Sequence, residues 1–138
     1  SDLIENLAFG AYNKGFEGNS KYDWLTKDTD IIEIYKNDKF CTFRFTVSAM
    51  HDLVKLNFLA NRCGWFKHLR KDMPVLMISG DKDPVGAHGK GVTAVYKKLL
   101  KTGHGDVTLK LYENCRHEIL NDTCKETVIA DILEFINR

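Results

Sequence analysis

The sequence lacks long hydrophobic runs and any marked excess of charge of one sign. No stretch approaches the roughly 18 consecutive apolar residues that a membrane span requires, and the polar start at Ser1, Asp2 and Glu5 is unlike a signal peptide. The 20 Lys and Arg residues nearly balance the 19 Asp and Glu residues, which leaves a formal net charge of +1. A nucleic-acid partner or a polybasic membrane anchor would require a strongly basic surface. We therefore predict neither a membrane span nor a nucleic-acid partner.

Cysteine, histidine and proline are also sparse, and none of them forms a pattern that marks a metal or redox site. The four cysteines contain no C-x-x-C pair, and the five histidines show no ligand spacing. We therefore expect no metal, no cofactor and free thiols in a reducing cytoplasm, including a structural thiol at Cys115. With two prolines, 43% hydrophobic residues and 28% charged residues, the chain has the composition of one globular domain.

The first part of the chain, residues 1–71, is predicted to be helical and aromatic. Asp2, with a glutamate three residues later, is typical of a helix start. Asp28 and Thr46 are suitable N-cap residues for two further helices, because each precedes apolar residues at helical spacing. Strand patterns occur only in residues 72–138, so we place a boundary between these two segments.

The order of elements in residues 72–138 predicts an α/β fold. A short apolar run at residues 74–80, bounded by proline and glycine, is typical of a buried parallel strand. Residues 91–101 carry an apolar stripe at helical spacing, and residues 107–112 alternate as a strand does. Thr123, with a glutamate three residues later, matches a capping box before a last helix. This order implies two parallel strands joined by a right-handed crossover helix.

Two candidate catalytic residues follow the ends of the predicted strands. Asp83 follows the first strand and His117 follows the second, and the carboxyl ends of parallel strands meet at the edge of a sheet where functional groups collect. A carboxylate beside an imidazole fixes the tautomer of the ring and stabilises the imidazolium. We predict that the two side chains meet at about 2.6–3.2 Å. A loop histidine is also commonly a solvated surface residue, so spacing alone leaves a structural role open.

Four stretches of the sequence resemble one enzyme family in their order and spacing. They are residues 22–28 (YDWLTKD), 40–46 (FCTFRFT), 74–86 (PVLMISGDKDPVG) and 116–121 (RHEILN). Together they resemble the C-terminal half of α/β-hydrolases of the lysophospholipase, monoglyceride-lipase and serine-aminopeptidase-like group. The resemblance extends over essentially the whole chain.

This resemblance implies a serine hydrolase architecture. Residues 1–71 would form a helical cap-like segment over the active site, and residues 72–138 would form the C-terminal part of the hydrolase core. Asp83 would be the acid of a Ser–His–Asp triad, and His117 would be its general base.

The resemblance also implies where a substrate would bind. The apolar side chains Phe43, Phe45 and Met50 of the cap-like segment would receive the acyl or other lipophilic group of a small ester or amide. If the family resemblance is set aside, the same residues are explained as core packing of the helical segment.

One departure from the family is large. The family's nucleophile lies in a G-x-S-x-G elbow, and neither this pentapeptide nor the oxyanion-hole loop before it occurs in the sequence. The resemblance therefore implies a fragment or a non-catalytic derivative, which we expect to be inactive alone. The free edge of the first strand should then be covered in a homo-oligomer or by the missing N-terminal half.

Two other functions stay open at the level of the sequence. Residues 89–94 match G-x-G-x-x-A at a predicted helix start, a dinucleotide-binding signature, although Gly89 lies nine positions past Gly80. A bound nucleotide there would favour this function, whereas a contact between Asp83 and His117 would favour the hydrolase. A non-catalytic interaction module would use the aromatic residues between 40 and 50 as a docking patch.

Overall fold

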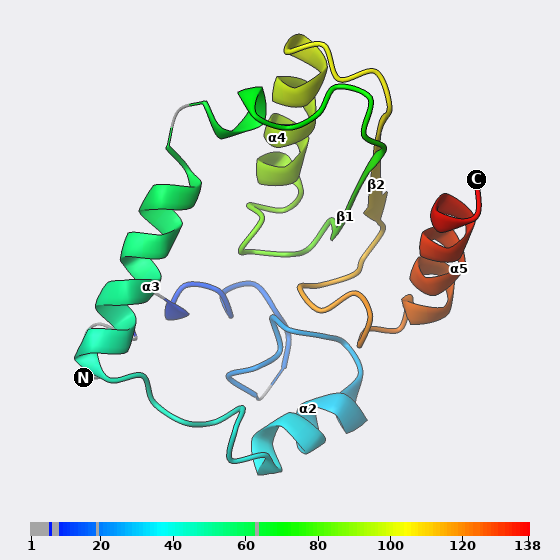
Figure 1. Cartoon of the computed structure of the whole chain (residues 1–138). Coiled ribbons are helices and arrows are strands. Elements are labelled where there is room, and N and C mark those ends of the chain that lie inside the picture. Colours follow the sequence, from blue (N-terminus) through cyan, green and yellow to red (C-terminus); the bar gives the residue numbers. More distant parts are fainter. Residues whose placement is uncertain (1–5, 7–8, 19, 63) are drawn as a thin grey trace.

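The computed structural model describes residues 6, 9–18, 20–62 and 64–138, in which helices surround a small parallel sheet (Figure 1). Its elements in chain order are α2 (Thr29–Asn37), α3 (Val47–Ala60), the 3-10 helix η1 (Trp65–Lys67), β1 (Val75–Gly80), α4 (Lys90–Lys101), β2 (Val107–Tyr112) and α5 (Lys125–Ile136). In Figure 1, α3 and α5 flank the molecule with the sheet between them. The helix start expected at Asp2 and Glu5 lies outside the described residues.

The two strands pair in parallel, as the sequence predicts. Their register extends from Val75 opposite Val107 to Gly80 opposite Tyr112. Helix α4 connects the strands and packs against both, and its Leu99 is buried. Both strands therefore end at the same edge of the sheet, from which two loops depart.

Strand β1 is less buried than its apolar sequence predicts. Residues 75–79 are half-buried, and only Gly80 is buried. Within the described part of the chain the sheet has two strands, so β1 has a neighbour on one side. The strand is confirmed, but its full burial is not, because a parallel strand is enclosed only when it has neighbours on both sides and cover on both faces.

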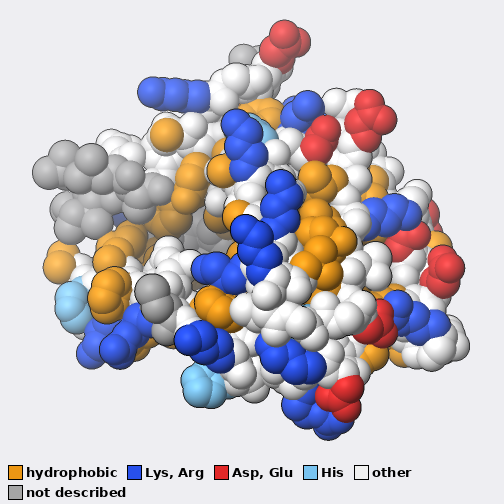
Figure 2. All heavy atoms as spheres, turned by 90° about the horizontal axis from the view of Figure 1, so that it is seen from above, with side chains coloured by type: hydrophobic (Ala, Val, Ile, Leu, Met, Phe, Trp, Pro, Cys, Tyr) orange, Lys and Arg blue, Asp and Glu red, His pale blue; other side chains and the backbone are white. Residues whose placement is uncertain are grey.

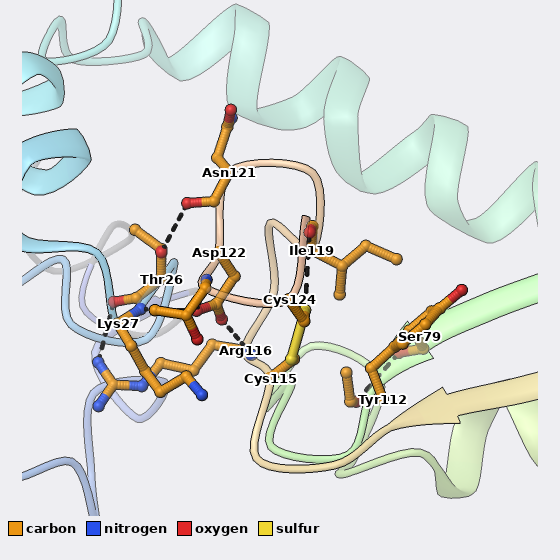
Figure 3. The surroundings of a disulfide bond; sticks show 12 residues. Thr26, Lys27, Ser79, Tyr112, Cys115, Arg116, Ile119, Asn121, Asp122 and Cys124 are labelled. Carbon is orange, nitrogen blue, oxygen red and sulfur yellow. Dashed lines mark hydrogen bonds between the residues drawn. A yellow bond between two sulfur atoms is a disulfide. The ribbon is translucent and has the colours of Figure 1, made fainter. Parts of the chain in front are cut away.

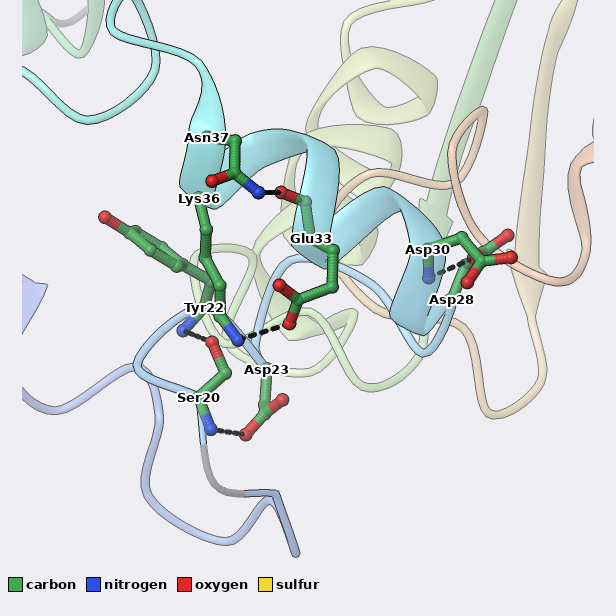
Figure 4. Close-up of polar contacts among 8 residues, drawn as sticks. All are labelled: Ser20, Tyr22, Asp23, Asp28, Asp30, Glu33, Lys36 and Asn37. Atoms are coloured by element: carbon green, nitrogen blue, oxygen red, sulfur yellow. Dashed lines mark hydrogen bonds and ion pairs between the residues drawn. The ribbon is translucent and has the colours of Figure 1, made fainter.

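Helices α2 and α3 begin where the sequence predicts, because each has a capping side chain. The Asp28 carboxylate accepts hydrogen bonds from the backbone N–H groups of Asp30 (3.0 Å, Figure 4) and Ile31 (3.2 Å). The Thr46 hydroxyl accepts one from Ala49 (3.1 Å). Caps of this kind stabilise a helix by about 0.5–2 kcal/mol.

Helix α5 begins differently from the prediction. It starts at Lys125, and its N-cap residue Cys124 makes no side-chain capping hydrogen bond. The Thr123 N–H donates instead to the Asp122 carboxylate (2.7 Å). The predicted capping box between Thr123 and Glu126 is therefore wrong, because a neighbouring carboxylate binds the backbone at this position.

Cys115 and Cys124 form a disulfide between the loop after β2 and the start of α5 (Figure 3). Their Cα atoms are 6.6 Å apart, and the bridge closes a loop that contains His117. The predicted free thiol at Cys115 is wrong, because the chain turns back on itself and brings together two cysteines whose spacing matches no motif. Because two of the four cysteines are paired, free thiols no longer support the prediction of a reducing cytoplasm.

The buried core lies where α5 meets the end of the sheet. Tyr112, Cys115 and Val128 are buried, and Ile78 of β1 packs against them. The Tyr112 hydroxyl donates a hydrogen bond of 2.7 Å to Asp131 of α5. Burial and this hydrogen bond raise the pKa of Tyr112 well above its usual range. The neutral phenol thus fixes α5 against the end of β2.

Several helix faces are apolar and yet exposed. In α3, Met50 is buried, but the exposed side chains include Val47, Leu53, Val54, Leu56, Phe58 and Leu59. Helix α5 exposes Ile129, Leu133 and Ile136. Figure 2 shows hydrophobic side chains reaching the surface in strips beside Lys and Arg. Because contiguous exposed apolar surface usually marks an interaction site, these faces are suited to contact further polypeptide.

A buried carboxylate joins the N-terminal segment to the loop after β2. Asp122 is 0% exposed and accepts hydrogen bonds from the backbone N–H groups of Lys27 (3.2 Å), Arg116 (2.7 Å) and Thr123 (2.7 Å). Figure 3 shows Asp122 among these partners. All three are donors, so a carboxylate, which accepts through both oxygens, matches this position better than an amide.

We expect Asp122→Ala to lower the free energy of unfolding by about 3 kcal/mol, because it removes the buried carboxylate that three backbone N–H groups share, and the loss of a partner costs about 1–3 kcal/mol for each group that water does not reach. Asp122→Asn should also destabilise, since its amide nitrogen would face a donor. Urea unfolding followed by circular dichroism measures both, with Glu134→Ala on exposed α5 surface as the control. An Asp122→Ala protein as stable as the control would contradict the assignment.

Candidate active site

The loops after β1 and β2 are bound to each other just beyond the strand ends. The Asp81 N–H donates to the Tyr112 carbonyl (3.0 Å), and the Lys82 N–H donates to the Cys115 carbonyl (2.9 Å). Gly80 permits this approach, because a Cβ atom there would collide with the backbone of Cys115 and its neighbour. The absence of a side chain at Gly80 therefore sets the distance between the two loops that carry the candidate catalytic residues.

The carboxylate of Asp83 is held in one orientation by its own loop. Its side chain is largely buried, and Oδ1 accepts a hydrogen bond from the Val85 N–H (2.9 Å). The Asp83 carbonyl also accepts one from the His88 N–H (2.8 Å). Pro84 restricts the backbone of Asp83 to extended conformations. The loop thus points the carboxylate toward the neighbouring loop before any substrate is present.

His117 contacts that carboxylate. Its Nδ1 lies 3.0 Å from Asp83 Oδ1, so the predicted contact is present. The imidazole side chain is 36% exposed, and Nε2 makes no hydrogen bond to the described residues. This arrangement suits an imidazole that takes a proton at Nε2 while a carboxylate stabilises the charge through Nδ1.

The contact between Asp83 and His117 favours the hydrolase function over the dinucleotide-binding function. Gly89, the first residue of the G-x-G-x-x-A match, is the N-cap of α4, and a loop of residues 81–88 separates it from β1. The signature works only when its first glycine lies in a tight turn directly after the strand. The match in this chain does not have that geometry.

A second segment of the chain supports the histidine loop. The His117 N–H donates to the Trp24 carbonyl (3.3 Å), and the Glu118 N–H donates to the Leu25 carbonyl (2.8 Å). The indole ring of Trp24 lies 5.1 Å from the imidazole ring, centroid to centroid. Residues 23–27 and 116–122 thus form one hydrogen-bonded unit, which we call the cap–histidine junction.

A cavity of about 510 Å³ lies beside this junction. The predicted substrate-binding residues Phe43, Phe45 and Met50 all line it, and Trp24 lines it as well. Phe43 and Phe45 contact each other and are partly exposed, whereas Met50 is buried. Burial and the neighbouring Cys41 thiol raise the pKa of Tyr35, another lining residue. The lining thus combines aromatic and apolar side chains, which suit a lipophilic group, with polar ones that include Lys21 and Arg44.

Two features are absent from the residues that the structure describes. No group of three or more His, Cys, Asp or Glu side chains among them is arranged to hold a metal ion. None of the helices formed by these residues has the length and apolar character needed to cross a membrane.

Comparison with known proteins identifies the family. The model of the family described as serine aminopeptidase, S33, matches residues 2–124. The chain belongs to this family. It is 30% identical to a highly thermostable carboxyl esterase from Bacillus coagulans, solved in complex with glycerol, with a TM-score of 0.85. A lipase in its open form is 24% identical, with a TM-score of 0.82; at this identity it supports the fold alone.

The chain matches only part of these relatives. It covers 45% of the esterase and 44% of the lipase, although 99% and 97% of its own residues are aligned. An uncharacterized abhydrolase domain-containing protein of Dictyostelium discoideum is 29% identical over 113 residues, which are 81% of this chain and 11% of that protein. The 138 residues thus form part of an α/β-hydrolase fold, and the resemblance seen in the sequence is confirmed.

The sequence analysis missed two residues that support the site. Trp24 contacts His117 and lines the cavity, and Asp122 binds the backbone on both sides of the cap–histidine junction. Both lie in or next to stretches that carry the family resemblance, at residues 22–28 and 116–121. Their contacts join positions that are far apart in the chain, so no local pattern could have assigned their roles.

We expect the neutral imidazole of His117 to carry its proton on Nδ1, because that nitrogen faces a carboxylate. Long-range ¹H–¹⁵N correlation spectra of the histidine rings report this tautomer directly. Asp83→Asn should shift the population toward the Nε2–H tautomer, since the amide can present its NH₂ group to Nδ1. The exposed His51 serves as the internal control. An unchanged His117 pattern in Asp83→Asn would contradict the pairing.

Proposed function

We propose that this chain supplies the acid, the general base and the acyl-binding cavity of a serine hydrolase that acts on lipophilic carboxylic esters. The observation that carries the proposal is the 3.0 Å contact between Asp83 and His117, next to a cavity to which Phe43, Phe45 and Met50 contribute apolar surface. The carboxyl esterase at 30% identity favours an ester over an amide. The nucleophilic serine would lie in polypeptide outside these 138 residues.

In the proposed reaction, His117 transfers one proton in each half. Its Nε2 takes the proton of the serine hydroxyl as the serine oxygen attacks the ester carbonyl, and the tetrahedral intermediate forms. The imidazolium then protonates the leaving alcohol, and an acyl-serine results. In the second half His117 takes a proton from water, which attacks the acyl group, and returns it to the serine. Asp83 stabilises the imidazolium in both halves.

The cavity would hold the acyl group during these steps. Phe43, Phe45 and Met50 present apolar surface to it, and burial of a methylene group contributes about 0.8 kcal/mol. An acyl chain too short to reach these side chains would gain little binding free energy from the cavity. We therefore propose a preference for esters with a lipophilic acyl chain, among them lysophospholipid-like and glyceride-like esters.

We also propose that further polypeptide covers the free edge of β1 and the apolar faces of α3 and α5. Support comes from the half-buried strand and from the exposed hydrophobic side chains of both helices. The cover is either the N-terminal half of the hydrolase or a second copy of this chain. Light scattering distinguishes a monomer from a homo-oligomer.

The 138 residues alone should be hydrolytically inactive, because a triad without its nucleophile cannot form the acyl intermediate. We expect no protein-dependent turnover of short-chain nitrophenyl esters and no labelling by a serine-directed fluorophosphonate. Stoichiometric labelling of a serine in this chain, located by mass spectrometry, would show that the nucleophile is within it and would overturn this part of the proposal.

In the protein that joins these residues to a G-x-S-x-G segment, His117→Ala and Asp83→Asn should each lower kcat for a nitrophenyl ester by a factor on the order of 10³ to 10⁴. The control is His51→Ala, which removes an exposed histidine of α3 and should leave kcat unchanged. Wild-type turnover by His117→Ala would refute the role of general base. A natural reading frame without such a segment would point to a non-catalytic derivative instead.

A further inference from the structure

We propose that Trp24 is a positioning residue for His117 and the side chain past which an acyl chain must extend from the pair of Asp83 and His117 into the cavity. This inference rests on the proposed function and deepens it. It concerns a contact between two parts of the chain that lie 93 positions apart, and it assigns the indole a role in orientation and in chain-length selection.

The backbone of Trp24 is fixed relative to the histidine loop. Its N–H donates to the Asn13 side chain (3.1 Å), and its carbonyl accepts from the His117 N–H (3.3 Å). The Arg116 guanidinium donates to the carbonyls of Asp23 and Thr26, one on each side of Trp24. The backbone of Trp24 therefore cannot move away from the histidine loop without breaking several hydrogen bonds.

The ring contact completes the control of the imidazole orientation. One hydrogen bond at Nδ1 fixes the position of that nitrogen, but the ring can still tilt about it. The indole of Trp24 lies against the imidazole at a centroid distance of 5.1 Å and an angle of 40°, and it also contacts the Tyr12 ring at 5.2 Å. Rings on two sides restrict the tilt of the indole, which in turn packs against the imidazole, and an indole next to an imidazolium also stabilises the positive charge.

The same indole forms the boundary of the cavity on the side of the catalytic pair. Trp24 lines the cavity together with Tyr22, Phe43 and Phe45, whereas neither Asp83 nor His117 is among the lining residues. An acyl chain that extends from the catalytic pair into the cavity would therefore contact the indole on the way. A change in the position of the indole should then be transmitted to His117.

The first test uses the 138-residue chain and 1-octanol as the probe. Trp65→Phe leaves Trp24 as the only tryptophan, because the sequence has two, and it removes an indole that does not line the cavity. Octanol should change the Trp24 emission and, at the same concentrations, move the His117 ring signal in ¹H–¹³C spectra, while His51 stays in place. Emission that does not respond, or responds without any movement of the His117 signal, would overturn the proposal.

Variants of Trp24 separate positioning from folding. In Trp24→Leu, the His117 signal should lose the ring-current shift and no longer respond to octanol, whereas Trp24→Phe, which keeps a ring, should restore part of the response. Thermal unfolding by circular dichroism identifies the variants that are folded. A His117 signal in folded Trp24→Leu that responds to octanol as in the parent chain would refute the coupling.

The second test uses the protein that carries the G-x-S-x-G segment. Trp24→Leu should lower kcat about ten-fold for acetate esters, which do not fill the cavity, because a misplaced base slows the chemical step. It should also move the preference toward longer acyl chains, while Trp24→Phe restores kcat. Unchanged kcat and chain-length preference in Trp24→Leu, with His117→Ala inactive, would overturn this inference alone. Activity of His117→Ala would instead overturn the proposed function.

Discussion

The hydrogen bonds of the cap–histidine junction are the interactions on which the rest of the site depends. Asp122 binds backbone N–H groups from Lys27 and Arg116, and the Thr26 hydroxyl donates to the Asn121 carbonyl (2.8 Å). These bonds connect segments about ninety residues apart, and most involve backbone groups that would otherwise be buried without partners. The position of His117 is therefore determined as much by the N-terminal segment as by the sheet.

The sheet contributes a second constraint, which acts at the strand ends. Parallel pairing brings Gly80 and Tyr112 to the same edge, and the missing side chain of Gly80 lets the following loops touch. Asp83 then needs only the short loop around Pro84 to reach His117. The contact between Asp83 and His117 thus arises from two independent supports, the strand ends for Asp83 and the cap–histidine junction for His117.

The difference between contacts of neighbouring residues and contacts of distant segments explains which features could be predicted from the sequence. The caps at Asp28 and Thr46, both strands and the α4 helix depend on neighbouring residues, so local patterns were sufficient. The contact of Asp83 with His117 followed from topology and the family resemblance. Two other features depend on how a loop closes against a distant segment, which the spacing of residues in the sequence does not predict. They are the disulfide between Cys115 and Cys124 and the position of Trp24. At Thr123, a locally plausible cap does not form, because its backbone N–H binds the carboxylate of the neighbouring Asp122 instead.

Strand β1 is incompletely buried, whereas Asp83 and His117 form an ordered contact in the same chain. Different features of the structure determine the two. Burial of a parallel strand depends on neighbours and on helices over both faces, which residues 72–138 provide only in part. The contact of Asp83 with His117 depends on short loops, on one glycine and on the junction, all of which lie within the described residues. Polypeptide added at the free edge of β1 would therefore bury apolar surface without having to create the contact between Asp83 and His117. By this reasoning, the proposed acid and base are preorganised independently of the polypeptide that would supply the proposed nucleophile.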